Sequence, residues 1–352
     1  MRPVAAISAM PLAERQGGVS RGDRTEPNHV RATCDATARL RHCVQQPGRR
    51  GENWPARPLT MVVPFAAGGG TDVLGRILGR RLSEILGQQV VIENVGGAGG
   101  MVGSARVAKA PPDGYQFVLG SRADAINQTL YKNPLYNFAT DLAPVVLIAD
   151  QPTLLVARND LPVANLAQFI AYARANQATM QMASAGAGST GHLDCMLLNA
   201  VIGINVTHVP YRGGGPAMQD LIAGRIDYIC TLSATARQQI EGKLIKAIAI
   251  LSSDRSSMLP ALASAREQGL DFEASTWFGF FLPKGTPEPI IQKLNAATVA
   301  AIDTPSVQEQ LKDVGAVAVA PERRSPGYLR KFVLSEVEKN AAPIKAAGLA
   351  MD

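Results

Sequence analysis

Two glycine-rich segments, 66–72 and 185–190, carry the clearest chemical signal in the sequence. Each follows a short apolar run typical of a buried strand and precedes apolar residues at helical spacing. In open α/β sheets, ligands bind beyond the carboxyl ends of the strands. The first N–H groups of a helix have no partner within the helix, and the helix dipole favours negative charge there. The two segments therefore predict a site in which main-chain N–H groups from two halves of the chain hold an anion such as a carboxylate.

A catalytic interpretation of the second segment is the alternative hypothesis. Residues 186–191 have the spacing G-x-G-x-x-G, but the next predicted strand ends without the acidic residue of a dinucleotide site, so only an NADP site that uses Arg212 remains conceivable. Ser189 lies in a near match to the nucleophile elbow G-x-S-x-G, and it is favoured as a helix cap. The available bases, His192 and His208, fall at a helix start and inside a strand. We therefore predict no catalytic residues, with a doubly wound NADP-dependent or acyl-transferring enzyme as the alternative.

Neither a metal nor a cofactor is expected. Residues 54–352 contain two His and two Cys, at no recognisable metal-ligand spacing. No G-K-[ST] follows the first glycine-rich segment, which excludes a P-loop nucleotide site. The sequence therefore favours recognition of a small ligand by the chain alone.

The positive charge is concentrated at the N-terminus. Residues 1–53 hold nine Arg, no Lys and five acidic residues, whereas residues 54–352 hold 26 basic and 24 acidic residues. The near-neutral body gives no reason to expect a nucleic-acid partner, and no apolar run reaches the ~18 residues of a membrane span. Residues 1–53 lack an apolar signal-peptide core, and we expect a disordered extension or a translation start assigned too far upstream.

The body shows the same strand–helix alternation twice, over 59–119 and 180–251. Two further apolar runs, 153–157 and 277–282, could connect the two parts, and three helical patterns end the chain, over 287–302, 305–313 and 325–347. This order predicts an α/β protein with two doubly wound lobes joined by two crossover strands. The expected boundaries are 54–155 together with 277–352 for the first lobe, and 156–276 for the second.

A series of motifs over residues 56–352 resembles the Bug, or TctC-type, family of extracytoplasmic solute-binding receptors of tripartite tricarboxylate transporters. The motifs are Pro64-Phe65-x-x-Gly68-Gly69-x-x-Asp72, Glu93-Asn94-x-x-Gly97-Ala98-Gly99-Gly100, Pro112-Asp113-Gly114-Tyr115, Ser184-Ala185-Gly186-x-Gly188-Ser189-x-x-His192-Leu193, Pro210-Tyr211-Arg212-Gly213-Gly214-x-Pro216-Ala217, Gly224-x-Ile226-Asp227 and Trp277-x-Gly279 followed by Pro283-x-Gly285-Thr286-Pro287. Each motif is weak alone, but their order over nearly the whole body is highly specific.

The resemblance implies a type II periplasmic-binding-protein fold that closes like a Venus flytrap around a small organic acid. It also implies a periplasmic monomer whose partners are the membrane subunits of a tripartite tricarboxylate-type transporter, although the chain shows no export signal. Carried over onto this sequence, the family's ligand-binding positions are Phe65, Ala66, Gly68, Gly69, Asp72, Ser121, Ala185, Gly188, Ser189, Thr190, His192, Tyr211, Gly213 and Thr231.

Several of these residues have a structural interpretation as well. Asp72 could cap its helix or bind a ligand's amine, hydroxyl or bound water, and His192 could start its helix or contact the ligand. Trp277 could pack at the hinge or line the cleft. Cys195 and Cys230 have no counterpart expected from the family. Because both are predicted on the cleft side of the second lobe, a disulfide between them is a further hypothesis.

Overall fold

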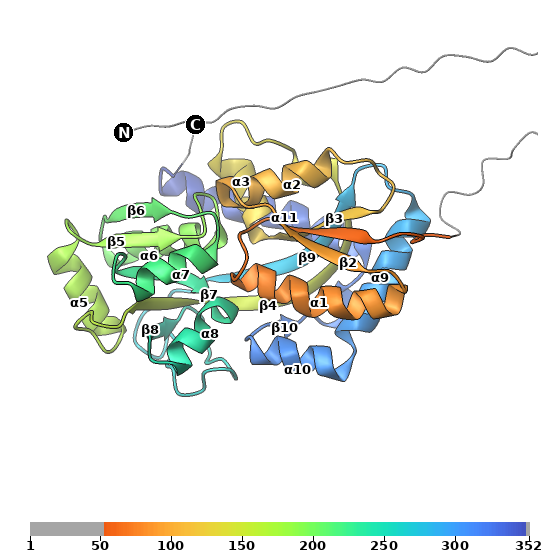
Figure 1. Cartoon of the computed structure of the whole chain (residues 1–352). Coiled ribbons are helices and arrows are strands. Elements are labelled where there is room, and N and C mark those ends of the chain that lie inside the picture. The colour runs from red at the N-terminus through yellow and green to blue at the C-terminus, as the bar shows by residue number, and fades with distance from the viewer. Residues whose placement is uncertain (1–52, 350–352) are drawn as a thin grey trace, which may run out of the picture. The chain divides into compact units, whose positions relative to one another are not determined.

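A computed structural model describes residues 53–349 (Figure 1). The predictions made for residues 1–53 lie outside this described part, apart from Asn53. The described chain alternates strands and helices, and the α/β class predicted from the sequence is confirmed. No helix within residues 53–349 is long and apolar enough to cross a membrane.

The first sheet contains the strands that precede and follow the predicted second lobe. Its strands are β1 (Leu59–Val63), β2 (Val90–Asn94), β3 (Gln116–Ser121), β9 (Ser275–Pro283), β10 (Val317–Ala318) and the first part of β4 (Leu142–Arg158). β1 pairs in parallel with β2 and β3, whereas β9 runs antiparallel to both β3 and β4. The carboxyl ends of β1 and β3 therefore lie at the same edge of this sheet.

The second sheet repeats this parallel arrangement. Its strands are β5 (Gln181–Ser184), β6 (Thr207–Pro210), β7 (Tyr228–Leu232), β8 (Ile245–Ile250) and the last part of β4. β5 pairs in parallel with β6 and β7. β4 pairs with β9 as far as Pro152 and with β7 from Thr153 onward, so a single strand runs through both sheets. The lobe boundaries given above stay a prediction.

Eleven α-helices connect and cover the strands in residues 53–349. They are α1 (Gly70–Leu86), α2 (Met101–Ala108), α3 (Arg122–Leu130), α4 (Phe138–Asp141), α5 (Leu166–Asn176), α6 (Thr190–Ile202), α7 (Gly214–Ile222), α8 (Ser233–Glu241), α9 (Glu288–Ile302), α10 (Pro305–Asp313) and α11 (Pro326–Ala346). The strands β3 and β7 end at Ser121 and Leu232 with no loop after them. The structure places the helices α3 and α8 directly after these strand ends.

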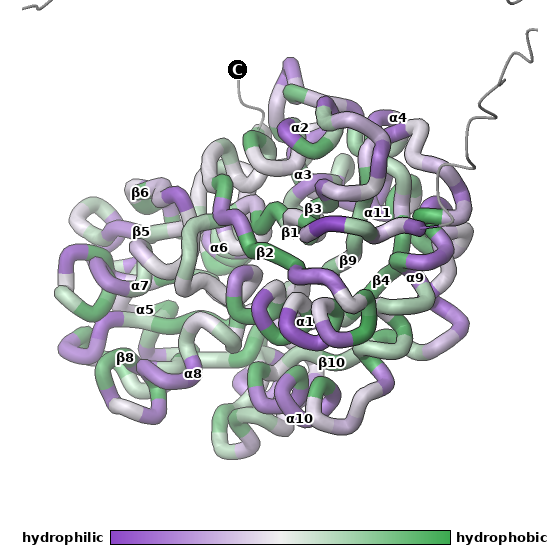
Figure 2. Tube along the Cα trace, turned by 45° about the vertical axis from the view of Figure 1, so that its right-hand side comes forward, coloured by the Kyte–Doolittle hydropathy of each residue, from purple (hydrophilic) through white to green (hydrophobic). Residues whose placement is uncertain are grey.

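Helix α1 shows how the apolar pattern places a helix start. Leu74, Leu78 and Leu82 recur every four residues and are fully buried against the first sheet. Arg76 and Arg80 are exposed, and Figure 2 shows hydrophilic as well as hydrophobic residues along α1, so the helix is amphipathic. The helix ends at Gly87 with φ 66°, the left-handed conformation expected of a C-terminal glycine cap. This packing fixes the amino end of α1 just beyond the carboxyl end of β1.

Candidate ligand-binding site

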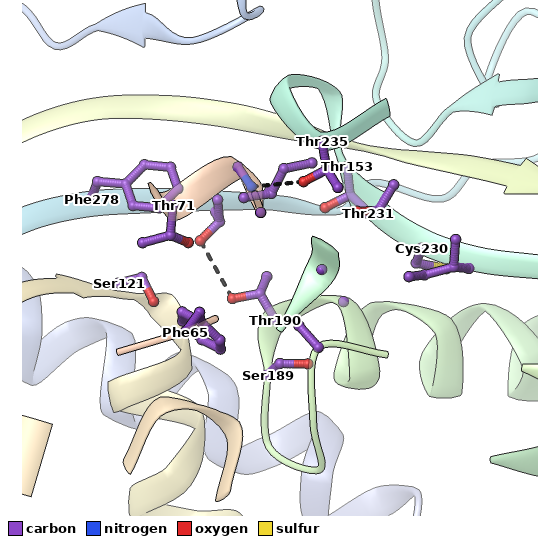
Figure 3. A pocket seen from close by; sticks show the side chains of 18 residues that line it. Phe65, Thr71, Ser121, Thr153, Ser189, Thr190, Cys230, Thr231, Thr235 and Phe278 are labelled. Carbon is purple, nitrogen blue, oxygen red and sulfur yellow. Dashed lines mark hydrogen bonds between the residues drawn. The ribbon is translucent and has the colours of Figure 1, made fainter. Parts of the chain in front are cut away.

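A pocket lies between the carboxyl edges of the two sheets (Figure 3). It is lined by Phe65, Gly69, Gly70, Thr71, Ser121, Thr153, Ala185, Ser189, Thr190, Gly191, Gly214, Ile229, Cys230, Thr231, Leu232, Thr235, Thr276 and Phe278. The volume of this partly open pocket is about 50 Å³, against roughly 10–15 Å³ for one water molecule. The pocket therefore suits a small ligand, and a ligand of more than a few heavy atoms would hold the two sheets slightly further apart.

Five helices begin at this pocket. The helices α1, α3, α6, α7 and α8 follow the strands β1, β3, β5, β6 and β7, and the cap or first turn of each contributes to the lining. In the described chain, the N–H groups of Thr71, Thr190 and Gly191 donate no hydrogen bond to another residue. Because these N–H groups lie at the positive ends of helix dipoles, they form an anion-binding surface without a charged side chain.

Direct hydrogen bonds join the two sides across the pocket. The Gly70 N–H of α1 donates to Thr235 Oγ1 of α8 at 2.7 Å. The Ala66 N–H donates to the carbonyl of Arg212 at 3.0 Å, and the Tyr131 hydroxyl donates to the carbonyl of Ala187 at 3.0 Å. The structure is thus a closed form in which the loops of the two sheets touch.

A buried ion pair crosses the interface behind the pocket. Arg122 Nη1 of α3 lies 2.7 Å from Asp194 Oδ1 of α6, and the pocket-lining Thr153 donates to Asp194 Oδ2 at 2.7 Å. Asp194 is 1% exposed, and burial raises its pKa although Arg122 opposes the effect. Because Asp194 is fully engaged by these two partners, its charge is not directed into the pocket. No sequence pattern indicates this pair, whose members are 72 residues apart.

Asp72 lies outside the pocket lining and holds the first glycine-rich loop in place. Its carboxylate accepts hydrogen bonds from the Gly68 N–H at 3.0 Å, Arg76 Nε at 2.9 Å and Asn94 Nδ2 at 2.9 Å. Burial acts to raise the pKa of Asp72, but the hydrogen bonds from these donors outweigh it and the pKa lies below its ordinary value. The geometry favours the structural interpretation of Asp72 over contact with a ligand.

Replacing Asp72 with asparagine is expected to loosen this loop without removing a ligand contact. The variant loses the ion pair with Arg76. Its side-chain NH₂ group would also face N–H groups that now donate to the Asp72 carboxylate. Together these changes are expected to lower the free energy of unfolding by about 1–3 kcal/mol. Urea denaturation measures the loss. Affinities for different acids should fall by one common factor, whereas a loss confined to ligands that carry an amine would show that Asp72 contacts the ligand.

His192 supports the second glycine-rich loop from behind. Its Nδ1 accepts a hydrogen bond from the Gly188 N–H at 3.3 Å, and its ring centroid lies 4.2 Å from that of His208. His208 Nε2 in turn lies 2.7 Å from Ser184 Oγ. Burial, with a smaller contribution from His208, lowers the pKa of His192 to about 3, and burial lowers the pKa of His208 to about 4. Both imidazoles are therefore neutral and structural at pH 7.

The two buried histidines, His192 and His208, predict that the protein loses stability in mild acid. An unfolded histidine protonates near pH 6.5, so the stabilisation is complete above that pH and is lost as the pH falls toward 4 and then 3. At pH 5 the loss is at most about 2 kcal/mol for each imidazole. Urea denaturation at pH 7 and pH 5 should show a fall that is about halved in His208→Gln. Equal falls in the two proteins would contradict the account.

The structure brings half of the sequence-predicted site residues to the pocket. Those that line it are Phe65, Gly69, Ser121, Ala185, Ser189, Thr190 and Thr231. Those that lie outside its lining are Ala66, Gly68, Asp72, Gly188, His192, Tyr211 and Gly213. Their contact with a ligand stays a prediction in every case.

The residues outside the lining shape the loops. Gly68 and Gly188 adopt φ values of 81° and 85°, which residues with a side chain rarely adopt. They form the tight turns that position the adjacent residues of the two loops. The Tyr211 hydroxyl donates to Asp220 at 2.6 Å, on its own side of the pocket. A Cβ on Gly213 would come within 2.7 Å of the Ala66 nitrogen, so this glycine permits the close approach of the two sides.

Sequence reasoning missed the residues that the crossover strands contribute. Thr153 comes from β4, and Thr276 and Phe278 come from β9. Trp277, between the last two, is 3% exposed and donates from its indole to Glu336 at 2.8 Å, which supports the packing interpretation. The alternating directions of β9 side chains could have indicated that its neighbours face the pocket.

Ser189 caps helix α6, as its sequence position favoured. Its Oγ accepts a hydrogen bond from the His192 N–H at 3.3 Å.

The structure also joins Cys195 of α6 to Cys230 of β7 in a disulfide. Cys230 lines the pocket, and a Cβ on Gly191 would come within 2.2 Å of the Cys230 carbonyl. The bond therefore ties the start of α6 to the end of β7, beside the pocket.

Comparisons with known proteins agree with this geometry. Residues 74–349 match the family described as tripartite tricarboxylate transporter family receptor. A protein from the TAR-I ttuE-ttuC' intergenic region of Agrobacterium vitis is 40% identical, over 84% of this chain and 86% of its own length. The structure of the periplasmic binding protein BugD is 38% identical with a TM-score of 0.82, over 85% of this chain and 100% of that one. MatC from Rhodopseudomonas palustris, solved with bound malate, is 38% identical with a TM-score of 0.80, over 83% and 100% of the two chains.

Proposed function

Because the chain belongs to the tripartite tricarboxylate transporter family of receptors, we propose that it captures one small carboxylic acid between its two sheets and delivers it to the membrane subunits of such a transporter. The family is one of binding proteins, so the chain is a solute-binding receptor and not an enzyme. The catalytic hypotheses for Ser189 and Arg212 are accordingly set aside.

The convergence of five helix starts on one pocket is the observation that carries the proposal. The N–H group of Thr71 comes from the first-sheet side, and the N–H groups of Thr190 and Gly191 come from the second-sheet side. A carboxylate held by donors from both sides stabilises the closed form more than the open form. A ligand shifts a conformational equilibrium only through such a difference in affinity, and the membrane subunits would then recognise the closed form.

A dicarboxylate is the ligand class that we propose, because solved relatives carry malate in one case and adipate in another. MatC was solved with malate, and the two chains share 38% of their residues over nearly the whole body. The small volume of the pocket also favours a short acid. We further propose a periplasmic location, because BugD is a periplasmic binding protein and the buried disulfide suits an oxidising compartment.

Isothermal titration calorimetry of the full chain with a panel of mono-, di- and tricarboxylic acids tests the proposal. We expect saturable binding of at least one short dicarboxylate at one site per chain. Circular dichroism of the same sample is the control for folding. Absence of binding by every acid in a folded sample would contradict the proposed function.

A further inference from the structure

Helix α3 makes contacts with the second-sheet side along its whole length. Its cap, Ser121, lines the pocket, and the next residue, Arg122, forms the ion pair with Asp194 of α6. At the other end of α3, the Tyr131 hydroxyl donates to the carbonyl of Ala187 in the second glycine-rich loop. One face of α3 is therefore the surface on which the second-sheet side rests when the pocket is closed.

An apolar cluster lies along α3 between these two polar contacts. Ile126 and Leu130 of α3 pack with Leu193 of α6 and Ile344 of α11, and all four residues are fully buried. Figure 1 shows α11 running beside α3, on the first-sheet side. Because burial of apolar surface is not directional, this cluster holds α6 against α3 without fixing its position. The ion pair is the directional contact between the two helices.

Both crossover strands hold this ion pair in place. Arg122 Nη1 also donates to the carbonyl of Ser275 in β9 at 3.0 Å, and Thr153 of β4 donates to Asp194 at 2.7 Å. Arg122 Nε donates to Asn340 Oδ1 of α11 at 2.9 Å. Neither member of the pair belongs to the pocket lining. The pair therefore acts on the position of the pocket walls and not on the ligand itself.

Burial makes the ion pair sensitive to closure. The side chain of Asp194 is 1% exposed and that of Arg122 is 15% exposed in this closed form. If the two sides separate, water solvates both charges, and an exposed ion pair contributes little. A buried carboxylate that loses its cation is strongly destabilised. Loss of the Arg122 charge should therefore penalise the closed form more than the open form.

We propose that Arg122 and Asp194 are positioning residues for ligand capture. Their ion pair forms as the two sides close, and it fixes how the starts of α3 and α6 face each other across the pocket. This role rests on the proposed function, because a ligand that is held by both sides gains affinity from every contact that favours the closed form. It does not depend on which acid the pocket takes.

Two variants of the pair test this role by titration calorimetry of the full chain with the acid that binds the wild type best. We expect Arg122→Met to bind at least about tenfold more weakly, because closure then buries the Asp194 charge without a cation. The double variant Arg122→Met with Asp194→Asn removes that charge as well, and it should bind at least about threefold more tightly than Arg122→Met. Wild-type affinity in Arg122→Met, or equal weakening in the two folded variants, would overturn the inference.

Arg158→Met is the matched control. It breaks the ion pair between Arg158 Nε and Asp227 Oδ1, 2.9 Å apart, whose members both lie in the second sheet. Urea denaturation without ligand should show a loss of stability in this variant, whereas its affinity should equal that of the wild type, since closure does not change a contact within one side. An affinity loss as large as that of Arg122→Met would overturn the inference, because any lost ion pair would then have the same effect.

A conservative variant keeps the test if Arg122→Met does not fold. Arg122→Lys keeps the charge, but a single ammonium group lacks the fork that reaches Asp194, Ser275 and Asn340 together. We expect about threefold weaker binding, and wild-type affinity would overturn the inference. Binding of no acid by the wild-type protein would instead contradict the proposed function, so the two failures are distinguishable.

Discussion

Replacing Gly96 with alanine is expected to weaken ligand binding about 10- to 100-fold while leaving the protein folded and nearly as stable as before. Gly96 follows β2 and does not have a positive φ, so its backbone accepts alanine without strain. A Cβ at this position would lie only 2.4 Å from the carbonyl oxygen of Arg212, on the other side of the interface. Overpacking of this kind costs about 1–3 kcal/mol, and each 1.4 kcal/mol is a factor of ten in affinity. The open form avoids the contact, so the cost falls on closure.

Gly327→Ala is the matched control for this substitution. Gly327 lies in α11 without a positive φ, and a Cβ there would meet nothing within 4 Å. Calorimetric titration with the best acid of the panel measures the affinity, and thermal unfolding measures the stability. We expect wild-type affinity in the control. An unchanged affinity in Gly96→Ala would show that binding does not require the closed arrangement described here.

Removing the disulfide by the double substitution Cys195→Ala and Cys230→Ala is expected to lower the unfolding free energy by about 4 kcal/mol. The bond closes a segment of 35 residues, and a loop of that length loses about this much unfolded-state entropy on cross-linking. Both residues are buried, so the substitutions also remove packed atoms from the core of the second sheet. Urea denaturation of the oxidised wild type and the variant measures the difference.

Reduction provides the control for the disulfide prediction. Denaturation with a thiol reductant should lower the stability of the wild type and leave that of the double variant unchanged, because the described chain contains no other disulfide. A loss below about 1 kcal/mol in the variant would indicate that the unfolded chain gains little freedom when the bond is absent. A reductant effect of equal size in both proteins would show that another group is responsible.

The strand–loop–helix units could be predicted because each carries a local signal. The apolar run before 66–72, the glycines and the helical spacing of Leu74, Leu78 and Leu82 together fix β1, its loop and α1. The same signals placed the loop before α6. Chemistry that depends on free helix N–H groups is therefore visible in the sequence, because it depends on where helices start and not on side-chain identity.

The crossover strands could be predicted only in part. The sequence indicated a strand over 153–157, but the structure extends β4 back to Leu142 through Pro144 and Pro152. Proline is a signal against a strand, since it cannot donate to a neighbouring strand. Thr153 was predicted on a crossover strand and not in the pocket wall, although it donates to Asp194 and lines the pocket.

The partners of buried charges could not be predicted at all. Asp72 was placed correctly at a helix start, but its bond to Asn94 depends on β2 lying beside β1. The pairing of Arg122 with Asp194 depends on the closed approach of α3 and α6. Contacts of this kind follow from tertiary packing, and a single sequence contains no periodic signal for them.

A crystal structure of the full chain with a bound short dicarboxylate is the most direct test of the central claim. We predict one carboxylate group within hydrogen-bonding distance of the main-chain N–H of Thr71 on one side and of Thr190 or Gly191 on the other, with no charged side chain in contact. A ligand bound elsewhere, or a carboxylate held by an Arg or Lys side chain, would contradict the account.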